Sequence, residues 1–146
     1  MATVLDVAKY IVDACGEADT WKLQKLVYYC QAWSLVWDER PLFESRIEAW
    51  ANGPVCPELF ARHKGLYAVG PSAPIWDGAN PCALTECERD TVNAVLRDYG
   101  SLPGYELREL THLEEPWKQA RNGVPPMENC SNEITHDSMR LYYGAL

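Results

Sequence analysis

Apolar residues recur every three or four positions along much of the chain, a spacing typical of amphipathic helices. Residues 4–15 show it first, with Thr3 placed to cap the helix and Gly16 to end it. A second helix is predicted from residue 19 or 20 to about residue 37. Because this second segment is apolar nearly all round, we expect it to be a central, buried helix.

Over residues 43–50 side chains of two kinds alternate: Phe43, Ser45, Ile47 and Ala49 take turns with Glu44, Arg46, Glu48 and Trp50. This alternation predicts a short strand. Asn52-Gly53 favours a turn after it, and Pro54 cannot donate a backbone hydrogen bond to a sheet. A third helix is predicted over residues 57–65, because proline suits its first turn. Residues 66–83 are rich in proline and glycine, and we expect a long loop with aromatic anchors.

The second half of the chain again has helical spacing. Thr85 and Glu88 form a capping box before a helix that ends near residue 100, and Pro116 begins a later, shorter one. Ile134 is placed to extend a small sheet, and Thr135 to cap a terminal helix. We therefore predict a mainly α fold: a single helical domain of residues 1–146 built round the central buried helix, with a small β-hairpin or short sheet.

Composition narrows the choice of partner. The chain has 146 residues, 47% of them hydrophobic, and a formal net charge of −8, so it is globular and repels phosphate backbones. The nearest basic pairs, Lys22 with Lys25 and Arg62 with Lys64, look like solvated helix faces. We expect no direct nucleic-acid binding, and a basic protein partner suits the charge better.

Membrane and metal sites are not predicted either. The longest apolar stretch, residues 26–37, is shorter than the ~20 residues that a bilayer requires, and no signal peptide is recognisable. We expect a cytoplasmic protein that does not bind membranes. None of the six cysteines forms a C-x-x-C pair, and the spacing of Cys82 and Cys87 is not a recognised zinc pattern. No metal or other cofactor is expected.

The stretch THLEEPWKQAR at residues 111–121 has two interpretations. As an active site, His112 would be a general base oriented by Glu114 or Glu115, and Arg121 would bind an anion. The chain, however, has no Gly-rich phosphate loop, nucleophile elbow or H-E-x-x-H sequence. No catalytic partner for His112 is therefore recognisable.

As a scaffold, the same stretch is explained residue by residue. Pro116 is pre-organised for a helix start, and Trp117 offers a large face to bury. Arg121, in the last turn, could pair back to a glutamate. The scaffold interpretation therefore accounts for more of the residues, and we prefer it to the enzyme.

Three segments, in order, resemble the signatures of the Panacea domain, also called the SocA-like antitoxin domain. They are TWKLQKLVYYCQAW at residues 20–33, PLFESRIEAWANGPVCPELF at residues 41–60 and LTHLEEPWKQAR at residues 110–121. The matching positions are Leu23, Lys25, Tyr29, Glu48, Ala49, Trp50, Gly53, Pro54, Val55, His112, Glu114, Pro116, Trp117 and Arg121. The terminal Tyr142-Tyr143 also fits, so the resemblance covers nearly the whole chain.

The resemblance implies an antitoxin of a two-gene toxin–antitoxin module, often carried by prophages. It implies direct protein contact with a cognate toxin encoded by the adjacent gene, and a mostly structural role for the signature positions. Two alternatives stay open. One is a proteolytic adaptor that delivers the toxin to a protease, and the other is a small enzyme that uses His112 as a general base.

Tyrosine and tryptophan, the aromatic residues with a polar end, greatly outnumber phenylalanine in this chain. Both are enriched at binding hot spots. We predict toxin contacts at aromatic residues that lie off the apolar stripes or in the long loop, namely Trp21, Tyr28, Tyr67, Trp76 and Tyr105. Lys25 and Tyr29 are two further candidates for toxin contact. The alternative for Lys25 is a solvated position in a helix turn, and the alternative for Tyr29 is a place in the core.

Overall fold

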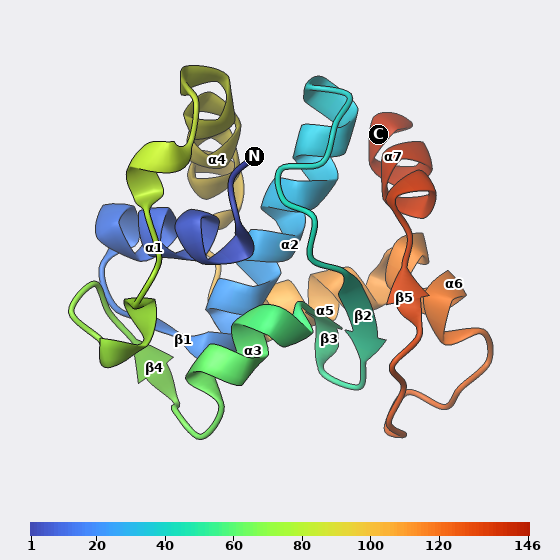
Figure 1. The fold of residues 1–146 in the computed structure, drawn as a ribbon. Helices are drawn as coiled ribbons and strands as arrows, with labels where there is room; N and C mark the ends of the chain where they lie inside the picture. The colour runs from blue at the N-terminus through green and yellow to red at the C-terminus, as the bar shows by residue number, and fades with distance from the viewer.

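The computed structural model describes all residues, 1–146, and is built round one long helix. Helix α2 (Thr20–Trp37) runs through the middle of the molecule, with α1 and α4 on one side of it and α6 and α7 on the other (Figure 1). The other helices are α1 (Val4–Cys15), α3 (Pro57–His63), α4 (Glu86–Tyr99), α5 (Gly104–Leu113), α6 (Glu115–Arg121) and α7 (His136–Gly144). The predicted mainly α fold with a central buried helix is confirmed.

Two small antiparallel sheets complete the fold. Strand β2 (Ile47–Trp50) pairs with β3 (Gly53–Val55) on one side and with β5 (Glu133–Ile134) on the other. The predicted hairpin is therefore present, and Ile134 extends its sheet opposite Ile47. Strand β1 (Ala18–Asp19) pairs with β4 (Ala68–Val69), which ties the start of α2 to the loop after α3.

Helix α2 is buried on nearly every side, and its two buried glutamines bond to neighbouring backbone. Gln31 accepts a hydrogen bond from Leu42 N (2.8 Å) and donates one to Phe43 O (2.8 Å). Gln24 accepts from Cys56 N (2.9 Å), just after β3. Because a buried amide is costly unless it is hydrogen-bonded, these two glutamines fix where the following segments dock on α2.

The predicted helix starts are confirmed by their side chains. Both capping boxes are present, Thr3 with Asp6 before α1 and Thr85 with Glu88 before α4. Thr135 caps α7 as expected. These signals are local, so they hold whatever the rest of the chain does.

The proline-rich segment 66–83 is more ordered than a plain loop. It contains β4 and two short 3₁₀ helices, η1 (Pro74–Trp76) and η2 (Pro81–Ala83). The predicted anchor Trp76 is buried, and its Nε1 donates to Gly70 O at 2.8 Å. The segment is thereby held against the core.

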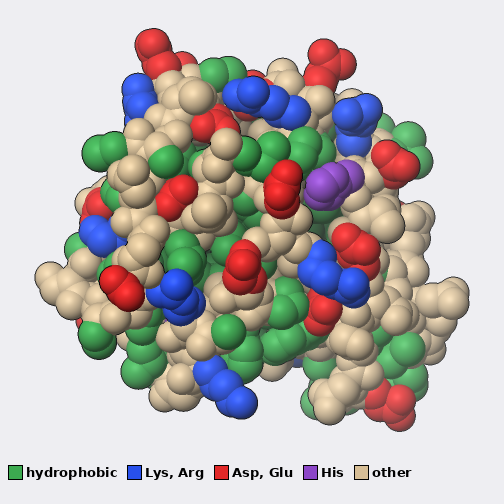
Figure 2. All heavy atoms as spheres, viewed as in Figure 1, with side chains coloured by type: hydrophobic (Ala, Val, Ile, Leu, Met, Phe, Trp, Pro, Cys, Tyr) green, Lys and Arg blue, Asp and Glu red, His purple; other side chains and the backbone are tan.

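Charges are mixed over the face seen in Figure 2. Acidic and basic side chains alternate there, with hydrophobic atoms between them, so this face carries no large patch of one sign. None of the helices is both long and apolar enough to cross a membrane.

Candidate functional site

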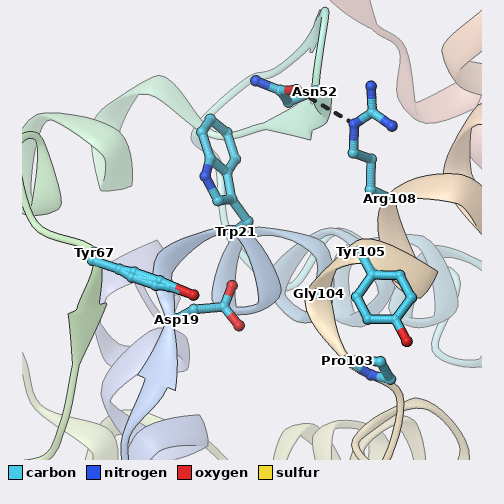
Figure 3. A pocket seen from close by; sticks show the side chains of 8 residues that line it. All are labelled: Asp19, Trp21, Asn52, Tyr67, Pro103, Gly104, Tyr105 and Arg108. Carbon is cyan, nitrogen blue, oxygen red and sulfur yellow. Dashed lines mark hydrogen bonds between the residues drawn. The ribbon is translucent and has the colours of Figure 1, made fainter.

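An open hollow of about 390 Å³ lies where the first turns of α2 and α5 meet the turn between β2 and β3. We call it the aromatic hollow, because Trp21, Tyr67 and Tyr105 line it and are 41%, 74% and 67% exposed. Figure 3 shows Tyr67 and Trp21 on one side and Tyr105 on the other. The residues that line it are Asp19, Trp21, Asn52, Tyr67, Pro103, Gly104, Tyr105 and Arg108.

The two helices approach closely at this point because of a glycine. The carboxylate of Asp19 caps α2 by accepting a hydrogen bond from Lys22 N at 2.8 Å. A Cβ atom at Gly104 would lie 2.8 Å from Asp19 Oδ1, so any side chain there would push α5 away. Gly104 therefore allows the start of α5 to sit against the cap of α2.

Arg108 lies one turn along α5 at the far end of the hollow (Figure 3). Its Nε donates a long hydrogen bond, 3.4 Å, to Asn52 Oδ1. It makes no ion pair, whereas Arg46 pairs with Glu48 at 3.0 Å. A guanidinium has five N–H donors, so most of the donors of Arg108 are free to bind a ligand.

Lys25 lies fully buried beneath the hollow, with no hydrogen-bond partner for its Nζ. The Nζ is 5.4 Å from the centre of the Trp21 ring, which lines the hollow above it. Burial, the charge of Arg108 and, in the opposite direction, the charge of Asp19 together lower the pKa of Lys25 to about 7. The prediction that Lys25 lies on a solvated helix face is wrong, because α2 is buried on every side from residue 23 to residue 32.

The third signature segment braces the β2–β3 hairpin. Trp117 Nε1 donates to Trp50 O at 2.8 Å. Arg121 donates to Ala49 O at 2.9 Å and, with its other nitrogen, to Pro125 O and Glu128 O, both at 2.6 Å. Arg121 thus binds backbone carbonyls, and its predicted pairing with a glutamate is wrong.

The two residues that suggested an active site do not contact each other. His112 stacks on Trp117, with ring centres 3.8 Å apart and planes at 9°. Glu114 is buried elsewhere and accepts hydrogen bonds from Tyr29 and Tyr143, each at 2.7 Å. Glu115 pairs with Lys118 at 3.3 Å. Neither glutamate orients His112, so the geometry expected of a general base is not present.

The protonation states fit a structural role. Burial, followed by the nearby charges of Arg108, Lys25 and Arg121, lowers the pKa of His112 to about 4, so the ring is neutral near pH 7. Burial raises the pKa of Glu114, and the two tyrosine hydroxyls oppose this shift. A histidine with a pKa so far below neutral is a weak base.

The order and placement of these segments agree with a known family. The family described as "Antitoxin SocA-like, Panacea domain" matches residues 23–118. The chain belongs to this family. No curated protein and no solved structure matches the chain.

The match runs from α2 into α6, so it includes Trp117 and most of the residues that line the hollow. Asp19, Trp21 and Arg121 lie just outside the matched range. Among the positions that resemble the Panacea signatures, Gly53, Trp117 and Arg121 hold the hairpin in place, and Tyr29 and Glu114 join α2 to the segment between α5 and α6. Lys25, another such position, does not line the hollow but faces the Trp21 ring that does.

The predicted toxin contacts divide into two groups. Trp21, Tyr67 and Tyr105 come together at the hollow although they are far apart in the sequence. Tyr28 is buried and bonds Tyr143 through its hydroxyl at 3.0 Å, and Trp76 is buried under its own loop. We therefore correct the set by removing Tyr28 and Trp76, which no partner can reach in this structure.

Sequence reasoning missed Arg108 and Gly104. A weak signal was present: Gly104, Tyr105 and Arg108 have the spacing that puts residues on one face of a helix. Nothing in the sequence indicated that this face would lie opposite the start of α2. The hollow is formed by a tertiary contact and has no motif of its own.

Proposed function

We propose that this protein is an antitoxin that binds its cognate toxin directly and blocks it, with the aromatic hollow at the centre of the interface. The family is described as antitoxin-like, which supports the partner class. The observation that carries the proposal is the meeting of Trp21, Tyr67 and Tyr105 at one open hollow. Exposed Trp and Tyr in a pocket are the residues that most often dominate the energy of protein binding.

The rest of the signature supports binding rather than catalysis. His112 is stacked and neutral, Glu114 is held by two tyrosines, and Arg121 is bound to carbonyls. Each of these side chains has a structural task that explains its chemistry. The toxin would be held inactive by a preformed surface on a rigid helical body, in the cytoplasm where both proteins are made.

The overall charge suggests how the partners meet. With a formal net charge of −8, the antitoxin attracts a basic toxin at long range. Such steering raises the association rate and is screened by salt. We therefore expect the association rate to fall as the salt concentration rises, while an unchanged rate would argue against steering.

The direct test uses the product of the neighbouring gene. Expressed alone, that product should arrest growth, and co-expression of this chain should restore growth and yield a stable, stoichiometric complex. Tyr67→Ala and Tyr105→Ala should each weaken the complex by about tenfold or more without changing the fold. Leu141→Ala is the matched control, because Leu141 is also exposed but lies on α7.

The same experiment separates the alternative of a proteolytic adaptor. A direct antitoxin leaves the amount of toxin unchanged and still protects a host that lacks the protease. An adaptor lowers the amount of toxin and loses its protective effect in that host. A harmless neighbouring gene product, or a harmful one that does not bind, would overturn the proposal.

A further inference from the structure

Two cationic side chains, Arg108 and Lys25, lie at or next to the aromatic hollow, with one carboxylate, that of Asp19, near them. Arg108 makes no ion pair and donates one long hydrogen bond, to Asn52. Lys25 is fully buried, and its Nζ makes no hydrogen bond, although it faces the Trp21 ring at 5.4 Å. A buried ammonium without a hydrogen-bonded anion is destabilising, and the lowered pKa of Lys25 shows that burial outweighs the ring and the charge of Asp19.

The backbone adds to the positive character of the hollow. Helix α5 begins at Gly104, and its N-cap residue, Pro103, offers no side chain to the free N–H groups of the first turn. The positive end of the helix dipole therefore faces the hollow. Asp19 is the one carboxylate that lines the hollow; it caps α2 and lies against the start of α5, and it makes no ion pair with Arg108.

We propose that the hollow receives an acidic side chain of the toxin, whose carboxylate binds Arg108 and compensates the charge of Lys25 beneath Trp21. This inference rests on the proposed antitoxin function and adds the chemistry by which the partner is recognised. A carboxylate matches the fork of a guanidinium with two parallel hydrogen bonds. When the toxin covers the rings of Trp21, Tyr67 and Tyr105, water leaves the hollow, which strengthens the ion pair.

The local charge is opposite to that of the whole protein, and the two have different consequences. The net charge of −8 favours a toxin that is basic overall. A single acidic residue on such a toxin, placed in the hollow, fixes the register of the complex. Toxins without an acid at this position would leave Arg108 and Lys25 unpaired, so the pair selects against wrong partners.

The first experiment measures the affinity for the toxin by calorimetry. Arg108→Ala should weaken binding by at least about tenfold, and Arg108→Lys should recover part of the loss. Arg97→Ala is the matched control, because Arg97 is an exposed arginine on α4 and should leave the affinity unchanged. Circular dichroism establishes that each variant is folded. Equal affinity of the Arg108→Ala and Arg97→Ala variants would overturn the inference.

A charge exchange then identifies the partner residue. The Arg108→Glu variant should fail to protect cells, and a screen of toxin variants with one Asp or Glu changed to Lys should recover a variant that it binds and neutralises. Failure of every such toxin variant to restore binding would overturn the inference.

Lys25 is tested through the pH dependence of binding. A carboxylate in the hollow favours the charged form of Lys25, so complex formation takes up a proton and the affinity should fall from pH 6 to pH 9. The charged or titratable groups near Lys25 are Arg108, Asp19, His63 and His112. Comparison with Lys25→Met removes the lysine and keeps the other groups in place. An identical pH profile for both proteins would contradict the assigned role of Lys25.

The two proposals fail in different ways. If the wild-type chain does not bind the toxin at all, the antitoxin function itself is wrong. If the wild-type chain binds and the Arg108 variants bind equally well, the interface exists but does not use a carboxylate in the hollow.

Discussion

The backbone of Gly53 lies directly against the side chain of Lys25. A Cβ atom at position 53 would come within 2.5 Å of Lys25 Cε and 3.1 Å of Thr111 Oγ1. Gly53 also has a φ of +110°, which side chains with a Cβ rarely adopt. The turn of the β2–β3 hairpin and the buried lysine of α2 are thus packed as one unit.

Gly53→Ala should lower the free energy of unfolding by more than about 2 kcal/mol, measured by urea denaturation, because it combines backbone strain with a steric clash. Gly65→Ala provides the control: Gly65 also has a positive φ, +85°, but open space around its would-be Cβ. The control should lose only about 1 kcal/mol, from backbone strain alone. Equal losses at the two positions would show that Lys25 does not constrain the hairpin.

Lys25→Met should make stability less dependent on pH. The pKa of Lys25 is lowered from 10.5 to about 7 in the folded state, so between these values the unfolded chain binds more protons than the folded one. The wild-type protein therefore gains stability as pH rises through this window and loses it as pH falls toward 7.

From pH 7 to pH 9, the unfolding free energy of the wild type should rise relative to Lys25→Met by on the order of 2 kcal/mol. The variant should be at least as stable as the wild type at pH 6, while its binding to the toxin is weaker. Parallel stability curves for the two proteins would show that Lys25 is charged throughout this range.

Arg121→Lys should lower the free energy of unfolding by about 3 kcal/mol, although the charge is kept. The guanidinium reaches three backbone carbonyls at once, those of Ala49, Pro125 and Glu128, and an ammonium cannot reproduce this fork. Arg140→Lys, at an exposed position of α7, should leave the stability unchanged. Thermal unfolding of both variants measures the difference.

His112→Phe should keep both the fold and the protection against toxin. The ring stacks on Trp117, its Nε2 has no partner, and its pKa near 4 leaves it neutral. An apolar ring can therefore replace it at a cost of about 1 kcal/mol, the usual value of the one hydrogen bond to the Ala51 backbone that is lost. A folded His112→Phe variant that still binds the toxin but no longer protects cells would instead support the enzyme. Growth rescue and the affinity, measured on the same variant, distinguish the two outcomes.

Some features could be predicted from the sequence because their causes are local. The capping boxes at Thr3 and Thr85 need only residues three positions apart, and both are present. Ile134 was predicted to extend the small sheet, and it pairs with β2. The apolar composition of residues 20–37 was enough to identify the central helix.

The same apolar composition is the reason for two errors. In a helix that is apolar nearly all round, no polar stripe marks a solvent side, so Tyr28 was taken for a surface residue and Lys25 for a solvated one. Trp76 was misplaced because the two short helices of its loop carry no strong pattern. In each case burial was decided by segments distant in the sequence.

The sequence by itself determined the helices, their caps, the hairpin and the membership of a family, because these depend on neighbouring residues and on their order. Only the tertiary structure decided that α5 would start against the cap of α2, that three aromatic rings would share one hollow, and that Arg108 would stand unpaired above a buried Lys25. The physical reason is that the residues of such a site come from separate elements. The distances between those elements are set by the packing of the whole core.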